Sequence, residues 1–201
     1  MKKHYLTHFF EPSTIAIIGT GEGSDSIEAK LSERLKEQFK GKVWLVHPRQ
    51  RSLLGGSRHY DTIDQVPGRV DLAIIVTPDS QVNEQLDRCA AVGIDSVVVL
   101  SHLDDRDGFL RNQFVESLRR QADNLGIRMW GPDCYGFVRP ALGIRATLDR
   151  VDIKPGKIAL ISHSGAICRA VTDWANASGV GFSTIISLEQ AAGVYAGDIL
   201  D

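Results

Sequence analysis

The sequence is poor in the features that mark several large classes of protein. It has three cysteines in 201 residues, and Cys89, Cys134 and Cys168 stand far apart. Such spacing suits neither a disulfide framework nor a zinc site, so we expect no metal. No run of 18 apolar residues occurs, and the stretch after Lys2 and Lys3 is too short and too polar for a signal-peptide core. We therefore expect a cytoplasmic protein that makes no contact with membrane.

An excess of charge of either sign is also missing. The chain has 23 Lys and Arg against 25 Asp and Glu, which gives a formal net charge of −2. A nearly balanced charge provides no electrostatic footprint for nucleic acid, so no nucleic-acid partner is expected. With 43% hydrophobic and 24% charged residues, the composition is that of a globular protein. The length allows one large domain, or one domain and part of another.

Seven apolar runs have the length of β-strands. Most of them are continuously apolar, which is typical of strands that are buried on both faces of a parallel sheet. The predicted strands cover residues 14–19, 42–47, 70–77, 95–101, 128–130, 157–162 and 182–188.

Helical periodicity separates these runs. Apolar residues recur at intervals of three or four in four segments, as in Ile27, Leu31 and Leu35. The predicted helices cover residues 25–39, 80–92, 109–125 and 165–177. Their predicted caps are Ser24 or Asp25, Asp79 or Ser80, and the glycines Gly126 and Gly179 after the third and fourth helix.

Alternation of strands and helices predicts an α/β fold with a mostly parallel, Rossmann-like sheet. Residues 131–156 break the alternation with prolines and glycines, so we place a domain boundary there, with domains 1–148 and 149–201. The second unit has two predicted strands and one complete helix. A two-stranded fragment cannot bury both of its faces. We therefore expect either the front part of a longer protein or a partner, which includes a homo-oligomer, that completes the sheet.

A glycine-rich turn follows the first predicted strand. Gly19, Gly21 and Gly23 have the spacing GxGxG, and Ser24 stands where the dinucleotide fingerprint has its third glycine. Exposed backbone amides at a helix N-terminus favour a phosphate, whereas the simpler alternative is a flexible strand-to-helix turn. The candidate phosphate-binding residues are Gly19, Thr20, Gly21, Glu22, Gly23 and Ser24.

The end of the second strand narrows the choice of ligand. An NAD site has Asp or Glu there, but this strand runs into His47, Pro48, Arg49, Gln50 and Arg51. Two guanidinium groups and no carboxylate favour a ribose that carries an extra phosphate, as in NADP or coenzyme A (CoA). Surface arginines after a strand are the alternative.

Further polar loops follow the other strands, at the edge where open α/β sheets bind ligands. The candidate residues in these loops are Thr77, Pro78, Ser101, His102, Gly131, Pro132 and Asp133. In the last loop, the proline and glycines allow close approach to a long, thin ligand, although a structural turn is equally consistent. The run "SHSGAI" then predicts an anion site at Ser162, Ser164 and Gly165, because hydroxyls and a glycine lead into a helix. It lacks the GxSxG pattern of a hydrolase elbow.

Six stretches together carry a resemblance to a known family. They are "FFEPSTIAIIGTG", "VHPRQ", "DLAIIVTPDSQV", "GPDCYG", "ISHSGAI" and "TDWANASGVGFSTIISL", in this order. From about residue 9 to residue 201 the chain resembles the NDP-forming acyl-CoA synthetases. It is also similar to the succinyl-CoA synthetase alpha subunit, and to the bacterial protein acetyltransferases that carry such a region.

The resemblance implies a CoA-binding Rossmann-like domain, followed by the first part of a flavodoxin-like domain. It implies that residues 19–24 hold the phosphates of CoA or acyl-CoA and that residues 48–51 contact the nucleotide end. Residues 100–102 meet the cofactor, residues 131–136 lie beside the pantetheine arm, and residues 162–165 face a phosphate on a catalytic histidine.

That histidine lies beyond the stretch that corresponds to residue 201, so the resemblance assigns no catalytic residue here. ATP or ADP would bind only through a nucleotide-grasp domain in the same or another chain.

The sequence departs from the family at three places. Asp133 replaces an asparagine, His163 stands where the family more often has glutamine, and Glu189 and Gln190 replace Gly-Asn. The last departure and the N-terminal "HYLTHFFEP" favour the branch in which the region regulates a lysine acetyltransferase domain. The leading hypothesis is a CoA-binding region of an acyl-CoA synthetase-like protein. An NADP-dependent oxidoreductase domain and a stand-alone module that senses CoA or a nucleotide are the alternatives.

Overall fold

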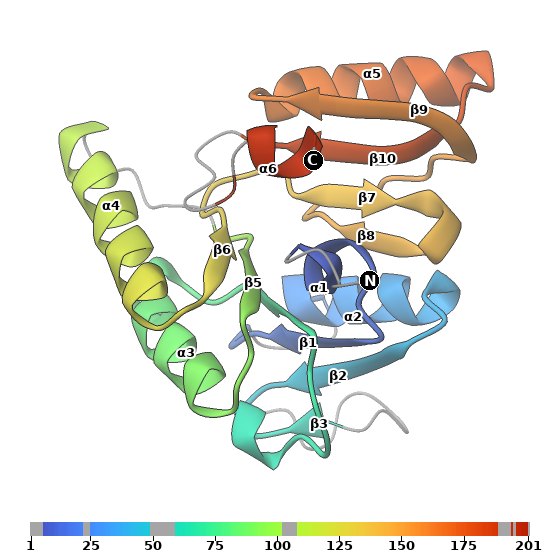
Figure 1. The fold of residues 1–201 in the computed structure, drawn as a ribbon. Coiled ribbons are helices and arrows are strands. Elements are labelled where there is room, and N and C mark those ends of the chain that lie inside the picture. The colour runs from blue at the N-terminus through green and yellow to red at the C-terminus, as the bar shows by residue number, and fades with distance from the viewer. Residues whose placement is uncertain are drawn as a thin grey trace.

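The chain forms two β-sheets, and helices lie both on their outer faces and between them (Figure 1). None of the helices in the described part of the chain has the length and apolar character needed to cross a membrane. A computed structural model describes residues 6–21, 25–48, 59–101, 108–188, 194 and 196–200.

The first sheet is fully parallel, which confirms the fold class predicted from the apolar runs. Its strand order is β3-β2-β1-β4-β5-β6, so the chain starts in the middle and winds outward on both sides. The two-residue strand β3 is too short to be predicted from periodicity. The six strands are β1 (Thr14–Ile18), β2 (Lys42–Val46), β3 (His59–Tyr60), β4 (Leu72–Ile75), β5 (Ser96–Val99) and β6 (Arg128–Trp130).

Helices cover both faces of this sheet because its strands are apolar on both faces. Ile17 of β1 belongs to the buried cluster that contains Leu31 of helix α2, whereas its neighbour Ile18 belongs to the cluster that contains Leu86 of α3. A short helix, α1, joins the α2 side. These helices are α1 (Thr7–Phe10), α2 (Ile27–Gln38), α3 (Asp79–Ala91) and α4 (Gly108–Asn124).

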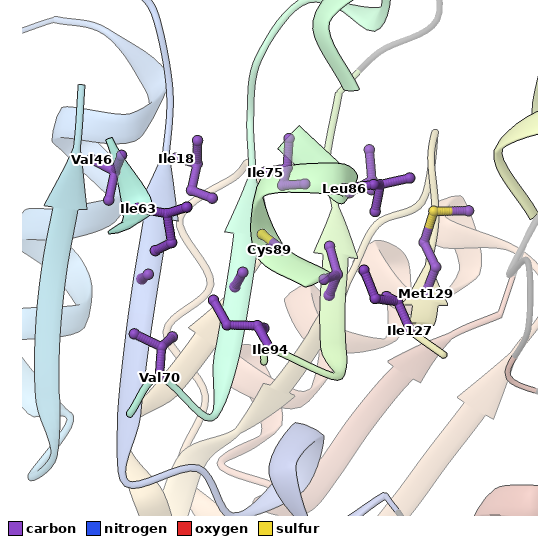
Figure 2. Close-up of a cluster of buried hydrophobic side chains, with 14 of the residues drawn as sticks. Ile18, Val46, Ile63, Val70, Ile75, Leu86, Cys89, Ile94, Ile127 and Met129 are labelled. Atoms are coloured by element: carbon purple, nitrogen blue, oxygen red, sulfur yellow. The ribbon is translucent and has the colours of Figure 1, made fainter. Parts of the chain in front are cut away.

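Figure 2 shows the cluster on the α3 side. Ile18, Val46 and Ile75, which end β1, β2 and β4, are no more than 2% exposed. Leu86 and Cys89 of α3 are fully buried against the same cluster. Burial raises the pKa of the Cys89 thiol to about 12. This cysteine therefore behaves as a small apolar side chain.

The caps differ in part from the predicted ones. Ser26, and not Ser24 or Asp25, caps α2, because its hydroxyl accepts from the Ala29 amide at 3.4 Å. Asp79 is already the first residue of α3, and no side chain caps that helix. The glycines predicted to end the later helices are confirmed, since Gly126 and Gly179 both have φ of +69°.

The second sheet has four strands in the order β8-β7-β10-β9. β9 and β10 pair in parallel, as expected for a strand–helix–strand unit, and α5 (Gly165–Ser178) connects them. β7 pairs antiparallel with both β8 and β10. The strands are β7 (Phe137–Arg139), β8 (Ile144–Ala146), β9 (Pro155–Ser162) and β10 (Phe182–Ser187), and a last helix, α6, covers Ala196–Leu200.

The β7–β8 hairpin was not predicted, and it changes the expected two-stranded fragment into a mixed sheet. Each of its strands has three residues, and a 3-10 turn over Pro140–Leu142 joins them before Gly143, with φ of +70°. Proline and glycine so close together indicate a loop and obscure the strands. The boundary between residues 148 and 149 stays a prediction.

One aromatic residue joins the two sheets. Trp130 ends β6, is fully buried, and its indole Nε1–H donates to the Ser187 carbonyl of β10 at 2.8 Å. Its ring stacks on Phe137 of β7 with centroids 5.6 Å apart and meets Phe9 and Phe10 edge-on. A single apolar cluster therefore runs from the first sheet into the second.

We expect Trp130→Phe to lower the free energy of unfolding by about 2 kcal/mol or more, because it removes buried volume and leaves the Ser187 carbonyl without its donor. Trp174→Phe is the matched control, since Trp174 is 59% exposed on α5. Urea denaturation of both variants measures the difference. Equal losses would show that the indole does not join the sheets.

Candidate functional site

The predicted site loops gather at one edge of the first sheet. Parallel strands all end at the same edge, so the residues that follow β1, β2, β4, β5 and β6 become neighbours. Hydrogen bonds across the strand ends hold them there. The Gly19 amide donates to the Val46 carbonyl at 3.1 Å, and the Leu100 amide donates to the Ile75 carbonyl at 2.9 Å. The geometry thus brings together loops that are up to 112 residues apart, as Gly19 and Gly131 are in the printed sequence.

Three hollows bordered by described residues follow this edge. The glycine-loop hollow, of about 510 Å³, is bordered by Thr20, Gly21, Asp25, Ser26, Ile27, Glu28, Val76, Thr77, Pro78, Leu100, Ser101 and Leu148. The Pro48 hollow, of about 180 Å³, is bordered by Ile18, Gly19, Thr20, Val46, Pro48, Asp61, Thr62, Gln81, Glu84, Gln85 and Arg88. The Cys134 hollow, of about 690 Å³, is bordered by Arg111, Asp133, Cys134, Tyr135, Leu148, Asp149, His163, Gly165, Ala166 and Arg169.

The hollows are consecutive. Thr20 borders both the Pro48 hollow and the glycine-loop hollow, and Leu148 borders both the glycine-loop hollow and the Cys134 hollow. The series runs from the end of β2, across the ends of β1, β4 and β5, to the N-terminus of α5. It therefore suits a long ligand better than a compact one.

Most of the predicted site residues that the structure describes border a hollow. Gly131 and Pro132 are buried behind the Cys134 hollow, and Ser162 and Ser164 flank it without being part of its lining. Those on a hollow are Gly19, Thr20, Gly21, Pro48, Thr77, Pro78, Ser101, Asp133 and Gly165. Glu22, Gly23, Ser24, Arg49, Arg51 and His102 lie outside the described residues, as do Glu189 and Gln190.

Thr77 carries a buried hydroxyl that the protein does not satisfy. The residue is 1% exposed, and among the described residues its Oγ1 has no hydrogen-bond partner. Its backbone carbonyl, by contrast, accepts from the Ser101 hydroxyl. An unsatisfied buried hydroxyl is costly, so a residue that carries one at the border of a hollow is a candidate ligand contact.

Glu28 and His47 are site residues that the sequence analysis missed. Glu28 lies in the first turn of α2, and its Oε1 accepts from the Gly21 amide at 2.6 Å. His47, directly after β2, has Nε2 at 2.6 Å from the Gly21 carbonyl oxygen and 3.3 Å from Glu28 Oε1. The glutamate belongs to no motif, and only the packing of α2 against the strand ends brings it to the loop.

The loop of residues 131–136 is held by its two glycines. Gly131 and Gly136 have φ of +88° and +92°, and a Cβ on either would overlap a backbone carbonyl oxygen, of Val99 or of Ala146. These positions therefore require glycine both for conformation and for space.

Asp133, in the same loop, forms an ion pair with Arg111 of α4. The guanidinium compensates the carboxylate that stands in place of the family's amide, so the departure does not leave a lone negative charge at the Cys134 hollow.

The predicted anion site lies at the N-terminus of α5. The Ser164 hydroxyl caps the helix by accepting from the Ile167 amide at 3.4 Å, and the Ser162 hydroxyl accepts from the Ser164 amide at 3.1 Å. Both hydroxyls thus shape the turn, and Gly165 borders the Cys134 hollow. The positive end of the helix dipole faces the hollow together with Arg169, which pairs with Asp149.

Two further observations concern the chemistry of this part of the site. Burial raises the pKa of the Tyr135 hydroxyl, so this side chain stays neutral near pH 7. No group of three or more His, Cys, Asp or Glu side chains suited to a metal ion occurs in the described part of the chain. The site offers backbone amides, hydroxyls and arginines, which are the donors that phosphate groups favour.

Two family models match the chain. One, described as a CoA binding domain, matches residues 13–140, and the other, described as a succinyl-CoA ligase like flavodoxin domain, matches residues 155–201. The first covers more than half of the chain. Both matches confirm the resemblance and the fold class expected from the sequence.

Curated relatives with ligase names match almost the whole chain. An acetate–CoA ligase [ADP-forming] I of Archaeoglobus fulgidus is 31% identical over 196 residues, which are 98% of this chain and 28% of that protein. The alpha subunit of an acetate–CoA ligase [ADP-forming] II of Pyrococcus furiosus is also 31% identical, over 98% of this chain and 42% of the subunit. The chain therefore spans less than half of the length of these relatives.

A solved structure of an acetyl-coenzyme A synthetase has the same fold over this chain. The apo form of acetyl-coenzyme A synthetase 1 from Ca. Korarchaeum cryptofilum superimposes with a TM-score of 0.85 at 30% identity. The superposition covers 98% of this chain and 42% of that one.

We expect Gly131→Ala to lower the free energy of unfolding by about 1–3 kcal/mol more than Gly126→Ala does, because only the former forces a methyl group against a carbonyl oxygen. Gly126 is the matched control, since it also has positive φ but no atom within 4 Å of the added Cβ. Denaturant titration of the two variants measures the difference. Similar losses would mean that the loop moves freely to make room.

Proposed function

The chain belongs to the CoA-binding domain family, and from this premise we propose that its three consecutive hollows bind CoA or an acyl-CoA. In this proposal the chain is the N-terminal region of an NDP-forming acyl-CoA ligase. The observation that carries the proposal is the adjacency of the hollows, which share Thr20 and Leu148 as lining residues. A cofactor with a nucleotide at one end and a thiol at the other end of a flexible arm needs such a path.

The proposed orientation follows from the donors in each hollow. The adenosine end lies in the Pro48 hollow, because Pro48 directly precedes Arg49 in the sequence. The diphosphate lies at the glycine loop, and the pantetheine arm crosses the rest of the glycine-loop hollow past Thr77, whose hydroxyl has no partner among the described residues. The thiol end reaches the Cys134 hollow, where the N-terminus of α5 provides a place for an anion such as phosphate next to it.

The reaction proposed for the whole protein takes place at the thiol end of the cofactor. An acyl-CoA and phosphate give an acyl phosphate and CoA, and the phosphoryl group then passes by way of a histidine to a nucleoside diphosphate and releases the carboxylate. The chain's part is to hold the acyl thioester next to a phosphate at Gly165. The nucleotide would bind to a nucleotide-grasp domain in the same or another chain, which accords with the printed name of an alpha subunit among the relatives.

The other hypotheses have less support. The relatives described above carry ligase names, which favours the ligase branch over the acetyltransferase branch. An NADP-dependent oxidoreductase rests on the glycine loop and on Arg49 and Arg51, and these two arginines lie outside the described residues. The cytoplasmic location expected from the sequence stays part of the proposal.

Isothermal titration calorimetry with CoA, acetyl-CoA, NADP and NAD tests the proposal directly. We expect heat of binding for CoA and acetyl-CoA and none for NADP or NAD, because neither dinucleotide has an arm that reaches the Cys134 hollow. Tight binding of NADP without binding of CoA would contradict the proposal. A titration of the Arg49→Ala plus Arg51→Ala variant with CoA and dephospho-CoA gives the control for orientation. Unequal losses, larger for CoA, place these arginines at the 3′-phosphate.

We expect Thr77→Val to weaken CoA binding by about two- to tenfold, the value of one hydrogen bond, while the free energy of unfolding stays the same or rises. The gain in stability follows because valine removes a buried hydroxyl without a partner. Thr14→Val, at the opposite edge of the sheet, is the matched control. If both variants bind CoA as the unmodified chain does, Thr77 does not contact the cofactor.

A further inference from the structure

An amide of the glycine loop already donates to a side chain of the protein itself. Glu28 Oε1 accepts from the Gly21 amide at 2.6 Å, and the side chain is 2% exposed. The sequence pattern predicted that a ligand's phosphate would accept a hydrogen bond from this amide. A carboxylate instead stands at the position where an incoming phosphate oxygen would make its hydrogen bond.

His47 lies next to the Glu28 side chain and binds the carbonyl of the same glycine. It is fully buried at the end of β2, with Nε2 at 2.6 Å from the Gly21 carbonyl oxygen. A carbonyl oxygen only accepts, so Nε2 carries the proton. The same nitrogen lies 3.3 Å from Glu28 Oε1. The amide and the carbonyl of Gly21 are therefore both engaged, one by Glu28 and the other by His47.

Gly19 makes the room that Glu28 needs. A Cβ at Gly19 would overlap the side-chain carbons of Glu28, and one at Gly21 would lie 3.0 Å from Glu28 Oε1. The first two glycines of the loop thus accommodate a side chain of the following helix. Their spacing predicted a phosphate site, whereas their immediate neighbour in the structure is this glutamate.

We propose that Glu28 determines the charge specificity of the glycine loop by competing with ligand phosphate for the Gly21 amide. This proposal rests on the CoA function proposed above. One amide proton cannot serve two oxyanions, and two negative charges in a site shielded from water repel each other strongly. A CoA diphosphate binds here only if the carboxylate gives up the amide or bears the repulsion. A ligand segment without phosphate, such as the pantetheine arm, is not affected.

Calorimetric titration of the full chain with CoA and with pantetheine tests the proposal. We expect Glu28→Gln to bind CoA about tenfold or more tightly than the unmodified chain, because the substitution keeps the shape and removes the charge. Pantetheine, which has no phosphate, is expected to bind both proteins equally. Glu33→Gln is the matched control, since Glu33 is exposed on the same helix, and it should leave both affinities unchanged.

The outcomes separate this inference from the proposed function. Equal CoA affinities, or weaker binding by Glu28→Gln, overturn the inference and leave CoA binding intact. If neither protein binds CoA, both proposals fail. Tighter binding of CoA and pantetheine alike also overturns the inference, because the effect would then not depend on phosphate.

A second measurement needs no substitution, in case the variant does not fold. The ¹³C resonance of the Glu28 carboxyl carbon is followed by NMR in the unmodified chain during titration. CoA should shift it as the hydrogen bond to Gly21 is lost, and pantetheine should not. A Glu28 resonance that stays in place when the chain is saturated with CoA would show that the carboxylate and the phosphate do not compete.

Discussion

The common direction of the strands in the first sheet is the constraint on which the site depends. Because β1, β2, β4, β5 and β6 are parallel, each strand ends at the same edge, and the loops that follow are neighbours despite their distance in sequence. The helices α2, α3 and α4 make this direction possible, since each returns the chain from the end of one strand to the edge at which the next strand begins. A single antiparallel strand among these five would place its loop on the other side of the molecule. The three hollows follow from this arrangement.

The second sheet extends the site because it shares a core with the first. Trp130 belongs to one sheet by its backbone and contacts the other by its ring and its Nε1–H. The aromatic contacts with Phe9 and Phe137 surround this link with apolar side chains. The N-terminus of α5 is thereby held next to the loop of residues 131–136, and the Cys134 hollow forms between them.

Much of this could be predicted from the sequence, for reasons that differ between elements. Continuously apolar runs such as that of β1 mark buried parallel strands, and the positions of the ligand loops follow from strand direction alone. The β7–β8 hairpin escaped prediction because three-residue strands carry too little periodicity next to proline and glycine. Thr77 was predicted as a site residue, but the sequence could not show that its hydroxyl lacks a partner, because this depends on how the surrounding side chains pack.

Glu28 and His47 could not be predicted, because their contact depends on how α2 packs against the ends of β1 and β2. The same holds for the pair of Arg111 and Asp133, which come from α4 and from the loop after β6. Local pattern shows which loop lies at the edge. It does not show which side chain from another element reaches that loop and changes its charge.

The position of Leu148 bears on the length of a molecule that can bind at this edge. It lies between β8 and β9 of the second sheet along the chain, and it borders two hollows at once. A small molecule that fills one hollow contacts only the residues that line that hollow. A molecule long enough to pass Leu148 has to match the spacing of both sheets. Under the proposed function, a whole cofactor and its fragments would then differ in how many of these hollows they reach.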